Sequence, residues 1–258
     1  MTRFKDMTVL VTGALGGFGQ RIVERFAAEG ANLVLSDLNA EALNAFAATL
    51  DAPVACLAGD VSDEDLSEKL VALAFEHFGG LDVAVNNAGV AQSFVRLANV
   101  PSDEARRILE IDLLGVFFAM KHQLPALERQ HRESKRRSAI VNIASVAGLG
   151  GAPKLSVYSA AKHGVIGLTK SAAAEYAGKG IRVNAVCPSY ARTAMAEAFT
   201  KLTRQSEEAA YAELTRGVPM KRLAEVDEVV EAIFFAADPK NSFMTGATIP
   251  VDGGTSAI

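Results

Sequence analysis

A phenol and an ammonium lie four residues apart in the stretch LSVYSAAKHGVIGLTKSAAAEYA, residues 155–177. Apolar residues recur there at three- and four-residue intervals, a pattern that predicts one long helix. Tyr158 and Lys162 therefore project from one face of that helix, a turn apart. An isolated phenol is a poor base at neutral pH, and a neighbouring ammonium stabilises its phenolate form. The pair could thus take a proton from an alcohol or return one to a ketone, with Tyr158 as general acid and base.

Ser145 ends a predicted strand upstream of Tyr158 and is expected at the same edge of the sheet. Its hydroxyl could hydrogen-bond to the oxyanion that develops during such a reaction. Each of the three residues also has an ordinary structural role. Ser145 could cap a turn, Tyr158 could be a half-buried aromatic, and Lys162 could extend along the surface. The catalytic interpretation is favoured because a nucleotide-binding pattern precedes all three.

That pattern is the stretch TGALGGFGQ, which directly follows the first predicted strand. Glycines permit a tight turn and a close approach of the backbone to a ligand, and the start of the next helix attracts a pyrophosphate. The order is G-x-x-x-G-x-G rather than G-x-G-x-x-G, because Ile22 stands where the last glycine would be. A tight turn alone would also need glycines, but the strand before and the helix after favour a dinucleotide site. The glycines are Gly13, Gly16, Gly17 and Gly19.

Asp37 ends the second predicted strand. A carboxylate there can accept hydrogen bonds from a ribose 2′-hydroxyl and would repel a 2′-phosphate. Its neighbours Gly16, Ser36 and Leu38 are uncharged, so the sequence predicts NAD(H) rather than NADP(H) as cofactor. The alternative role for Asp37 is that of N-cap of the following helix.

Two further polar groups follow the third and fourth predicted strands: Asp60 with Val61, and the stretch NNAG at 86–89. Asp60 could bind the adenine, and Asn87 could hold backbone or ribose. Each alone is typical of a turn. Their common location at the carboxyl edge of a parallel sheet favours a shared ligand.

Short β-branched runs alternate with helical patterns along the whole chain. The runs are continuously apolar, which is typical of strands covered on both faces. We therefore expect an α/β fold, an open parallel sheet flanked by helices on both faces, in a single domain over 1–258. A helical excursion at about 189–223 is expected to act as a substrate lid. The predicted strands are 8–12, 32–37, 54–59, 81–87, 138–145, 181–187 and 247–252.

Composition excludes several other classes of protein. Lys plus Arg number 26 and Asp plus Glu 30, a net charge of −4 that does not suggest a nucleic-acid partner. The basic run at 129–137 is predicted to be a solvated helix end. No signal peptide opens the sequence and no apolar run is long enough to span a membrane, so a cytoplasmic location is expected. Cys56 and Cys187 are predicted to be buried free thiols, and no metal site is expected.

Together these motifs resemble the short-chain dehydrogenase/reductase family over essentially the whole chain. TGALGGFG resembles the family's T-G-x-x-x-G-x-G loop, NNAG matches its motif after the fourth strand, Ser145 with YSAAK matches its serine and Y-x-x-x-K, and TGATIPVDGG (245–254) resembles its final strand. The resemblance implies a doubly wound Rossmann-type sheet of seven parallel strands and usually a homotetramer built on the long helices. The expected cofactor-binding residues are Gly13, Gly16, Gly17, Phe18, Gly19, Asp37, Leu38, Asp60, Val61, Asn87, Ala88, Gly89, Tyr158, Lys162, Pro188, Tyr190 and Thr193.

Asp112 departs from the family's catalytic tetrad, which has an asparagine at this position. In the family, the main-chain carbonyl of that residue holds a water that contacts the lysine, and an aspartate would keep this role. Its carboxylate could also act on Lys162 if it stays ionised. We expect activity with a shifted pH profile, and an Asp112→Asn variant with an unchanged profile would show that the charge does not matter.

Two smaller departures concern the cofactor. Ser189 replaces the glycine that usually follows Pro188, which puts the local turn in question. Thr193 matches the family threonine that contacts the cofactor carboxamide, with a helix cap as its alternative role, and Tyr190 is placed for backbone contact there. At Gly16 many NADP-using relatives carry arginine or serine, which agrees with the prediction from Asp37.

The segments expected to contact substrate are 90–97, 146–155 and 189–202. The segment 146–155 is small and apolar, and the few cations of the three segments include Lys154, Arg96 and Arg192. This favours a small neutral secondary alcohol or ketone. An NAD-dependent alcohol dehydrogenase or ketone reductase is therefore the leading hypothesis. An NADPH-dependent reductase of 3-oxoacyl groups or other biosynthetic ketones is the second, and a non-catalytic dinucleotide sensor the third.

Overall fold

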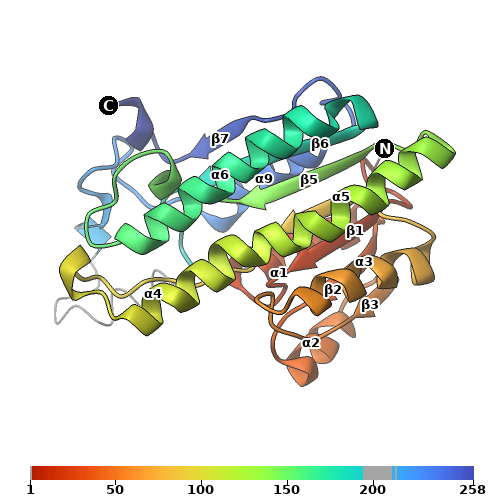
Figure 1. Cartoon of the computed structure of the whole chain (residues 1–258), viewed down its shortest axis with the longest axis horizontal. Coiled ribbons are helices and arrows are strands. Elements are labelled where there is room, and N and C mark those ends of the chain that lie inside the picture. The colour runs from red at the N-terminus through yellow and green to blue at the C-terminus, as the bar shows by residue number, and fades with distance from the viewer. Residues whose placement is uncertain (1, 194–210, 213) are drawn as a thin grey trace.

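One parallel sheet of seven strands forms the centre of the protein (Figure 1). The computed structural model describes residues 2–193, 211–212 and 214–258. The strand order is β3-β2-β1-β4-β5-β6-β7, and each neighbouring pair is parallel. This confirms the predicted α/β doubly wound fold. The strands are β1 (Thr8–Thr12), β2 (Asn32–Ser36), β3 (Val54–Cys56), β4 (Val83–Asn86), β5 (Ser138–Ile143), β6 (Ile181–Pro188) and β7 (Thr248–Val251).

The strands form because their apolar runs are buried on both faces. Every residue of β1 and of β5 is buried. β3 is shorter than the predicted 54–59, since it lies at the sheet edge and has a partner strand on one side only. Even so, the Gly59 amide beyond its end still donates to the Asp37 carbonyl at 3.0 Å. The chain after β3 therefore stays beside β2, where the predicted cofactor residues begin.

Helices cover both faces of the sheet. One apolar cluster joins the sheet to α1, α2 and α9, and a second joins the opposite face to α3, α5 and α6. α5 and α6 are the longest and run side by side (Figure 1). The helices are α1 (Gly17–Ala28), α2 (Ala40–Ala47), α3 (Glu64–Phe78), α4 (Ser102–Leu109), α5 (Gly115–Ser134), α6 (Ser156–Tyr176) and α9 (Val226–Ala237), with a π-helical turn at Glu110–Leu114 and 3-10 turns at Leu97–Asn99, Val146–Gly148, Ala177–Lys179 and Thr255–Ala257.

The direction of winding reverses between β1 and β4. The chain passes from β1 outward to β3, then returns to β4 and continues outward to β7. At such a reversal the connections that follow the two neighbouring strands run in opposite directions, which leaves a crevice for a ligand outside the carboxyl ends of the strands. The predicted glycine loop follows β1, and NNAG follows β4, so both lie at this crevice.

The basic run at 129–137 differs from its prediction at Gln130, which is buried, and at Arg136. α5 ends at Ser134, and Lys135 adopts a left-handed conformation with φ 59°. The Arg136 guanidinium, however, pairs with both carboxylate oxygens of Asp82, a side chain buried at the amino edge of the sheet. The interpretation as a solvated helix end is therefore wrong for Arg136, because a buried carboxylate needs a cation.

Other local expectations have mixed outcomes. Gly30 follows α1 with φ +79°, as a glycine that ends a helix should. Cys187 is a buried free thiol, as predicted, but Cys56 is only partly buried. The expected lid at 189–223 is partly outside the described residues, which omit 194–210 and 213. In the described part of the chain, no helix has the length and apolarity needed to cross a membrane, and no His, Cys, Asp and Glu side chains cluster as metal ligands would.

Candidate functional site

A cavity of about 560 Å³ lies at the carboxyl ends of β1, β2 and β4. Twelve of the predicted cofactor-binding residues line it, which brings together segments from residue 13 to residue 193. This volume falls within the range of cofactor and small-molecule sites. The predicted residues in its wall are Gly13, Gly16, Gly17, Phe18, Asp37, Leu38, Asp60, Val61, Asn87, Ala88, Gly89 and Thr193.

The glycine loop between β1 and α1 cannot carry side chains at two of its positions. Gly13 has φ +63°, and a Cβ there would lie 2.8 Å from the Cα of Ala88. A Cβ on Gly19, which does not line the cavity, would lie 1.9 Å from the Gly13 carbonyl oxygen. Glycine at Gly19 lets α1 begin directly against the loop, and the first two residues of the helix, Gly17 and Phe18, line the cavity. This cradle suits the pyrophosphate of a dinucleotide.

The segment after β4 holds the loop in place. Asn87 donates from its side-chain nitrogen to the carbonyl oxygens of Thr12 and Gly13, both at 3.0 Å. The Thr12 hydroxyl in turn accepts from the backbone amides of Asn87 and Ala88. Of the two roles predicted for Asn87, contact with backbone is therefore confirmed. Thr12 was not among the predicted residues, although the T-G dipeptide at the loop start was a signal for it.

Asp37 stands at the wall of the cavity with both carboxylate oxygens engaged by backbone. One accepts from the Leu15 amide and the other from the Leu38 amide, each at 2.8 Å. The alternative role as N-cap of α2 is wrong, because Asn39 fills it and accepts from the Ala42 amide. Asp37 thus joins the glycine loop to the end of β2 and presents negative charge to the cavity.

Asp60 also lines the cavity, but its present contacts are those of a turn. One of its carboxylate oxygens accepts from both the backbone amide and the hydroxyl of Ser62. The N-cap of α3 is Asp63 rather than Asp60. The adenine contact expected for Asp60 stays a prediction.

Lys162 and Tyr158 adopt the predicted arrangement on α6. Lys162 is 4% exposed, and its Nζ lies 5.4 Å from the centre of the Tyr158 ring. The ammonium donates to the Ile143 carbonyl at the end of β5 at 3.1 Å. Lys162 is therefore a buried cation fixed against the sheet, and the surface role considered for it is wrong.

Ser145 is buried two residues past β5. Its hydroxyl accepts from the Ala147 amide at 3.2 Å, which caps the 3-10 turn Val146–Gly148, and it lies 3.4 Å from the Pro188 carbonyl oxygen. The turn-cap role is therefore real. This long contact leaves the hydroxyl proton weakly held and able to turn to another acceptor.

Asp112 lies in the π-helical turn between α4 and α5 and is fully buried. Its Oδ1 accepts from the Val90 amide at 2.7 Å, while Oδ2 has no hydrogen-bond partner among the described residues. Burial raises the pKa of the Asp112 carboxyl, and the nearby Lys162 ammonium partly opposes this. A Cβ on Gly89 would lie 2.9 Å from that Oδ1 and 3.5 Å from Lys162 Nζ. Asp112 and Lys162 therefore both lie next to Gly89, which lines the cavity.

The end of β6 completes this side of the site. Ser189 replaces glycine without strain, since it is absent from the positive-φ positions and its amide donates to the Val251 carbonyl. Thr193 lies against the glycine loop, where a Cβ on Gly17 would be 3.2 Å from its side chain. Burial raises the pKa of Tyr190, and the neighbouring Tyr158 contributes to this. The helix-cap alternative for Thr193 concerns residues outside the described ones.

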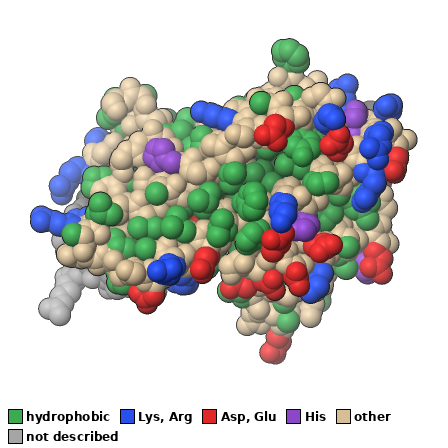
Figure 2. Space-filling model, viewed as in Figure 1, with side chains coloured by type: hydrophobic (Ala, Val, Ile, Leu, Met, Phe, Trp, Pro, Cys, Tyr) green, Lys and Arg blue, Asp and Glu red, His purple; other side chains and the backbone are tan. Residues whose placement is uncertain are grey.

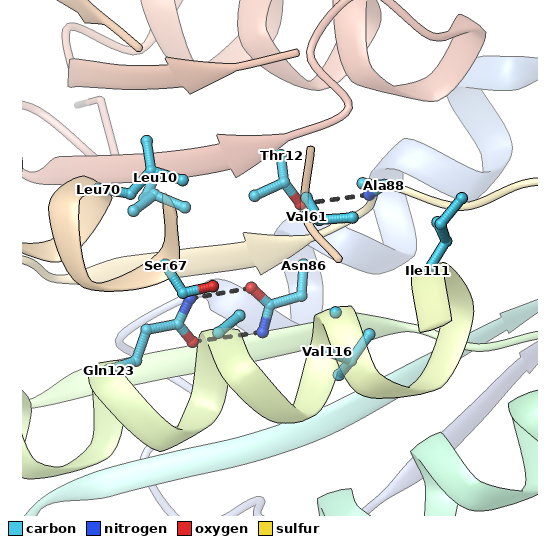
Figure 3. A pocket seen from close by; sticks show the side chains of 12 residues that line it. Leu10, Thr12, Val61, Ser67, Leu70, Asn86, Ala88, Ile111, Val116 and Gln123 are labelled. Carbon is cyan, nitrogen blue, oxygen red and sulfur yellow. Dashed lines mark hydrogen bonds between the residues drawn. The ribbon is translucent and has the colours of Figure 1, made fainter. Parts of the chain in front are cut away.

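A second, much smaller cavity of about 10 Å³ lies beneath the first, between the sheet and α5 (Figure 3). The side chains of Asn86 and Gln123 form two reciprocal hydrogen bonds at its edge (Figure 3). Its size fits about one water molecule. It is therefore a packing feature below the cofactor cavity rather than a ligand site.

Sequence reasoning missed several residues of the larger cavity. Leu15, Gly59 and Ile111 line it through their position in loops and turns, for which the sequence offered no separate signal, whereas Val90 lines it from the predicted substrate segment 90–97. Arg107 on α4 also lines it and is close enough to Asp112 to act on its pKa.

Comparison with known proteins agrees with this geometry. A family model described as "Enoyl-(Acyl carrier protein) reductase" matches residues 13–256. The 2,5-dichloro-2,5-cyclohexadiene-1,4-diol dehydrogenase of Sphingobium indicum is 38% identical over 100% of both chains. The meso-2,3-butanediol dehydrogenase of Serratia marcescens is 39% identical over 99% of this chain and 96% of its own. The chain belongs to the short-chain dehydrogenase/reductase family.

Solved structures share the architecture closely. The crystal structure of levodione reductase superposes with a TM-score of 0.92 at 35% identity and covers 99% of both chains. The structure described as ElxO with NADP bound superposes with a TM-score of 0.88 at 30% identity, over 98% of this chain and 99% of that one.

Proposed function

We propose that this protein is an NAD(H)-dependent oxidoreductase that interconverts a small secondary alcohol and a ketone, with Tyr158 as general acid and base. The observation that carries the proposal is the buried Lys162 ammonium, 5.4 Å from the Tyr158 ring centre. Its Nζ would lie 3.5 Å from a Cβ on Gly89, a residue that lines the cavity suited to a dinucleotide. Relatives named for the dehydrogenation of diols and the reduction of levodione support the reaction class.

The catalytic roles divide among the chain's own residues. Tyr158 takes the proton from the alcohol or returns it to the ketone, and Lys162 stabilises the phenolate form. Ser145, with its weakly held hydroxyl proton, hydrogen-bonds to the substrate oxygen as negative charge develops there. When bound, the nicotinamide cofactor supplies or accepts the hydride. The glycine cradle and Thr193 would hold it at the mouth of the cavity.

Asp37 supports NAD(H) as the preferred cofactor. Its carboxylate would lie where a 2′-phosphate must fit, and like charges repel. Arg107 is the one cation among the described residues that line the cavity, and it acts on the pKa of Asp112. Among the described residues, Asp37 has backbone amides as its hydrogen-bond partners and no ion pair. The negative charge at the end of β2 is therefore not offset from within the wall.

A second candidate is an NADPH-dependent reductase of 3-oxoacyl groups or other biosynthetic ketones. Two observations favour it: the family model carries the description of an acyl-carrier-protein reductase, and a neighbouring structure is described with NADP bound. Titration of the protein with NADH and with NADPH separates the candidates. NADPH binding as tight as NADH binding would contradict the first proposal.

We also propose a cytoplasmic homotetramer of single-domain subunits, in which 189–223 covers the substrate. Support for association comes from apolar side chains gathered over α5 and the turn before it (Figure 2). Leu109 at the end of α4, Leu114 in the π-helical turn and Phe117 in α5 are each at least 37% exposed. Exposed apolar side chains that gather in one patch are typical of surfaces that bind another protein. The molar mass measured by light scattering during gel filtration tests the tetramer.

The experiment that tests the reaction follows nicotinamide absorbance with secondary alcohols plus NAD⁺ and ketones plus NADH. Vicinal diols and cyclic alcohols come first, since relatives are named for them. Tyr158→Phe should lower kcat by about a thousandfold or more, because the proton acceptor is gone. Tyr176→Phe, at the other end of α6, is the matched control and should keep wild-type kcat. Turnover that survives in Tyr158→Phe would contradict the role of Tyr158.

A further inference from the structure

The first turn of α6 has no cap of its own. The residue before the helix is Leu155, whose side chain has no hydrogen-bond acceptor. The first amides of any helix lack partners within the helix, and a side-chain oxygen just before it usually accepts from the second or third of them. In α6 these are the amides of Val157 and Tyr158, so the general acid and base sits in the turn that lacks a local cap.

Gln92, which lies 65 residues before Val157 in the sequence, provides the missing hydrogen-bond acceptor for the first turn of α6. Its Oε1 accepts from the Val157 amide at 2.9 Å and from the Tyr158 amide at 3.0 Å. Gln92 is 6% exposed, so water competes little for these bonds. A remote side chain thus performs the task of an N-cap on the backbone of Tyr158 itself.

The other end of the same amide holds a second loop. Gln92 Nε2 donates to the Lys154 carbonyl at 3.2 Å. Lys154 has φ +69°, a left-handed conformation that is uncommon for residues other than glycine. The Lys154 ammonium also lies 5.4 Å from the ring centre of Phe94, two residues after Gln92. The segment after β4 and the loop before α6 are therefore joined at two points.

The segment that carries Gln92 is itself anchored upstream. Two residues earlier, the Val90 amide donates to Asp112 Oδ1 at 2.7 Å. The stretch from Val90 to Gln92 therefore bridges the π-helical turn and the start of α6. Any shift of this stretch would move the first turn of α6 with it.

We propose that Gln92 is a positioning residue for the reaction, which caps the first turn of α6 and fixes the backbone of Tyr158 relative to the cofactor cavity. This inference rests on the proposed function for its catalytic consequence. Gln92 need not touch substrate. It acts through Tyr158, and it holds two of the three segments expected to contact substrate, 90–97 and 146–155, as one unit.

The test compares three variants of the full-length protein. Gln92→Met keeps the side-chain length but removes both polar atoms. Gln92→Glu keeps oxygens that accept from the two amides and suits the positive end of a helix. Gln130→Met is the matched control, because Gln130 is also 6% exposed and also bridges backbone, accepting from and donating to Leu81, but at the amino edge of the sheet.

Hydrogen exchange at 156–160 and steady-state kinetics are measured on each variant. In Gln92→Met we expect amide exchange there to speed up about tenfold and kcat to fall about tenfold, while the Kd for NADH stays within about twofold. Gln92→Glu should keep exchange and kcat within about threefold of wild type. Gln130→Met should lose thermal stability but keep kcat.

Three outcomes would overturn the proposal. They are unchanged exchange in Gln92→Met, wild-type kcat in that variant despite fast exchange, or a loss of kcat in Gln92→Glu as large as in Gln92→Met. Absence of turnover by the wild-type protein with every alcohol and ketone would instead contradict the proposed function. The exchange measurement would still decide whether Gln92 caps the helix.

Discussion

Two buried aspartates lie at opposite ends of the strands of the sheet, and they differ in how many hydrogen-bond partners their carboxylates have. Asp82, at the amino edge, has both carboxylate oxygens paired with Arg136, and Oδ2 also accepts from the Thr8 amide at 2.7 Å. Asp112, at the carboxyl edge, has one hydrogen bond to Val90 and an unpartnered Oδ2 among the described residues. Both oxygens of the Asp82 carboxylate therefore have partners within the protein, whereas only one oxygen of Asp112 has a partner among the described residues.

The difference shows how this fold separates stability from chemistry. A buried charge that is paired and hydrogen-bonded keeps elements together, and its loss leaves the partner uncompensated. A buried polar group without a full set of partners lowers stability but remains available to a ligand, a proton or water. Functional sites commonly carry such a cost. We therefore expect substitutions at the amino edge to change stability and those at the carboxyl edge to change activity.

The largest expected effect is on activity, at Lys162. Lys162→Met should lower kcat by about a thousandfold, because the phenolate of Tyr158 loses its neighbouring cation. Thermal stability should hold or rise, because removal of a buried ammonium also removes its desolvation cost. Kinetics and thermal unfolding of the same preparation test both. A large fall in Tm with unchanged kcat would contradict the expectation that substitutions at this end of the sheet change activity rather than stability.

The next effect is on stability, at Asp82. Asp82→Ala should lower the free energy of unfolding by about 3 kcal/mol, because Arg136 and the Thr8 amide both lose a buried acceptor. The kcat of the folded protein should stay near that of wild type. Urea unfolding measures the first and steady-state kinetics the second. Arg136→Met combined with Asp82→Ala should cost less than the sum of the two single changes.

A third aspartate, Asp37, sharpens the comparison at the carboxyl edge. Asp37→Asn removes the charge and keeps one oxygen for the backbone amides. The ratio of NADPH affinity to NADH affinity should rise about tenfold, which corresponds to about 1.4 kcal/mol. Fluorescence titration with both cofactors measures it. An unchanged ratio would mean that Asp37 serves only to join the glycine loop to β2.

The smallest effect is the pH dependence of stability at Asp112. Because burial raises the pKa of its carboxyl, the folded protein holds that proton to a higher pH than the unfolded chain does. The stabilisation that protonated Asp112 contributes is fully present below the ordinary pKa of a carboxyl group. It is lost as pH rises through the raised pKa of the folded protein. The side chain of Asp112→Asn cannot ionise. The Tm of this variant minus the Tm of wild type should therefore increase by about 2 °C as pH rises.

Thermal unfolding of both proteins at acid and at mildly alkaline pH measures this difference. A constant difference in Tm at all pH values would show that the Asp112 carboxyl has the same pKa in the folded and the unfolded protein. The pH profile of kcat, recorded on the same two proteins, tests the separate expectation that the carboxylate shifts the activity profile.

The sequence predicted most of the fold because the relevant signals are local. Continuous apolar runs placed all seven strands, and the spacing of Tyr158 and Lys162 on one helix predicted their contact. The π-helical turn was not predictable, since EIDLLG has the apolar spacing of an ordinary helix. Local competition decides against the alternative role of Asp37, because Asn39 two residues later caps the helix.

Long-range contacts account for what the sequence could not predict. Gln92 lies in a loop without periodicity, and its partners are 62–66 residues away. Arg136 belongs to a charged run whose other members give no sign that one of them reaches a buried carboxylate. Such pairings depend on the final arrangement of the sheet, which no short window of sequence contains.

The contact between Gly17 and Thr193 has a consequence for synthesis of the chain. These residues come from the first and sixth crossovers of the sheet, so the wall of the cofactor cavity is complete only when three quarters of the polypeptide has emerged and packed. Contacts of such long sequence separation form late, because a large loop must close first. A chain that is still being synthesised would therefore bind the dinucleotide only at the end of folding, and the dinucleotide would not stabilise the early folding steps.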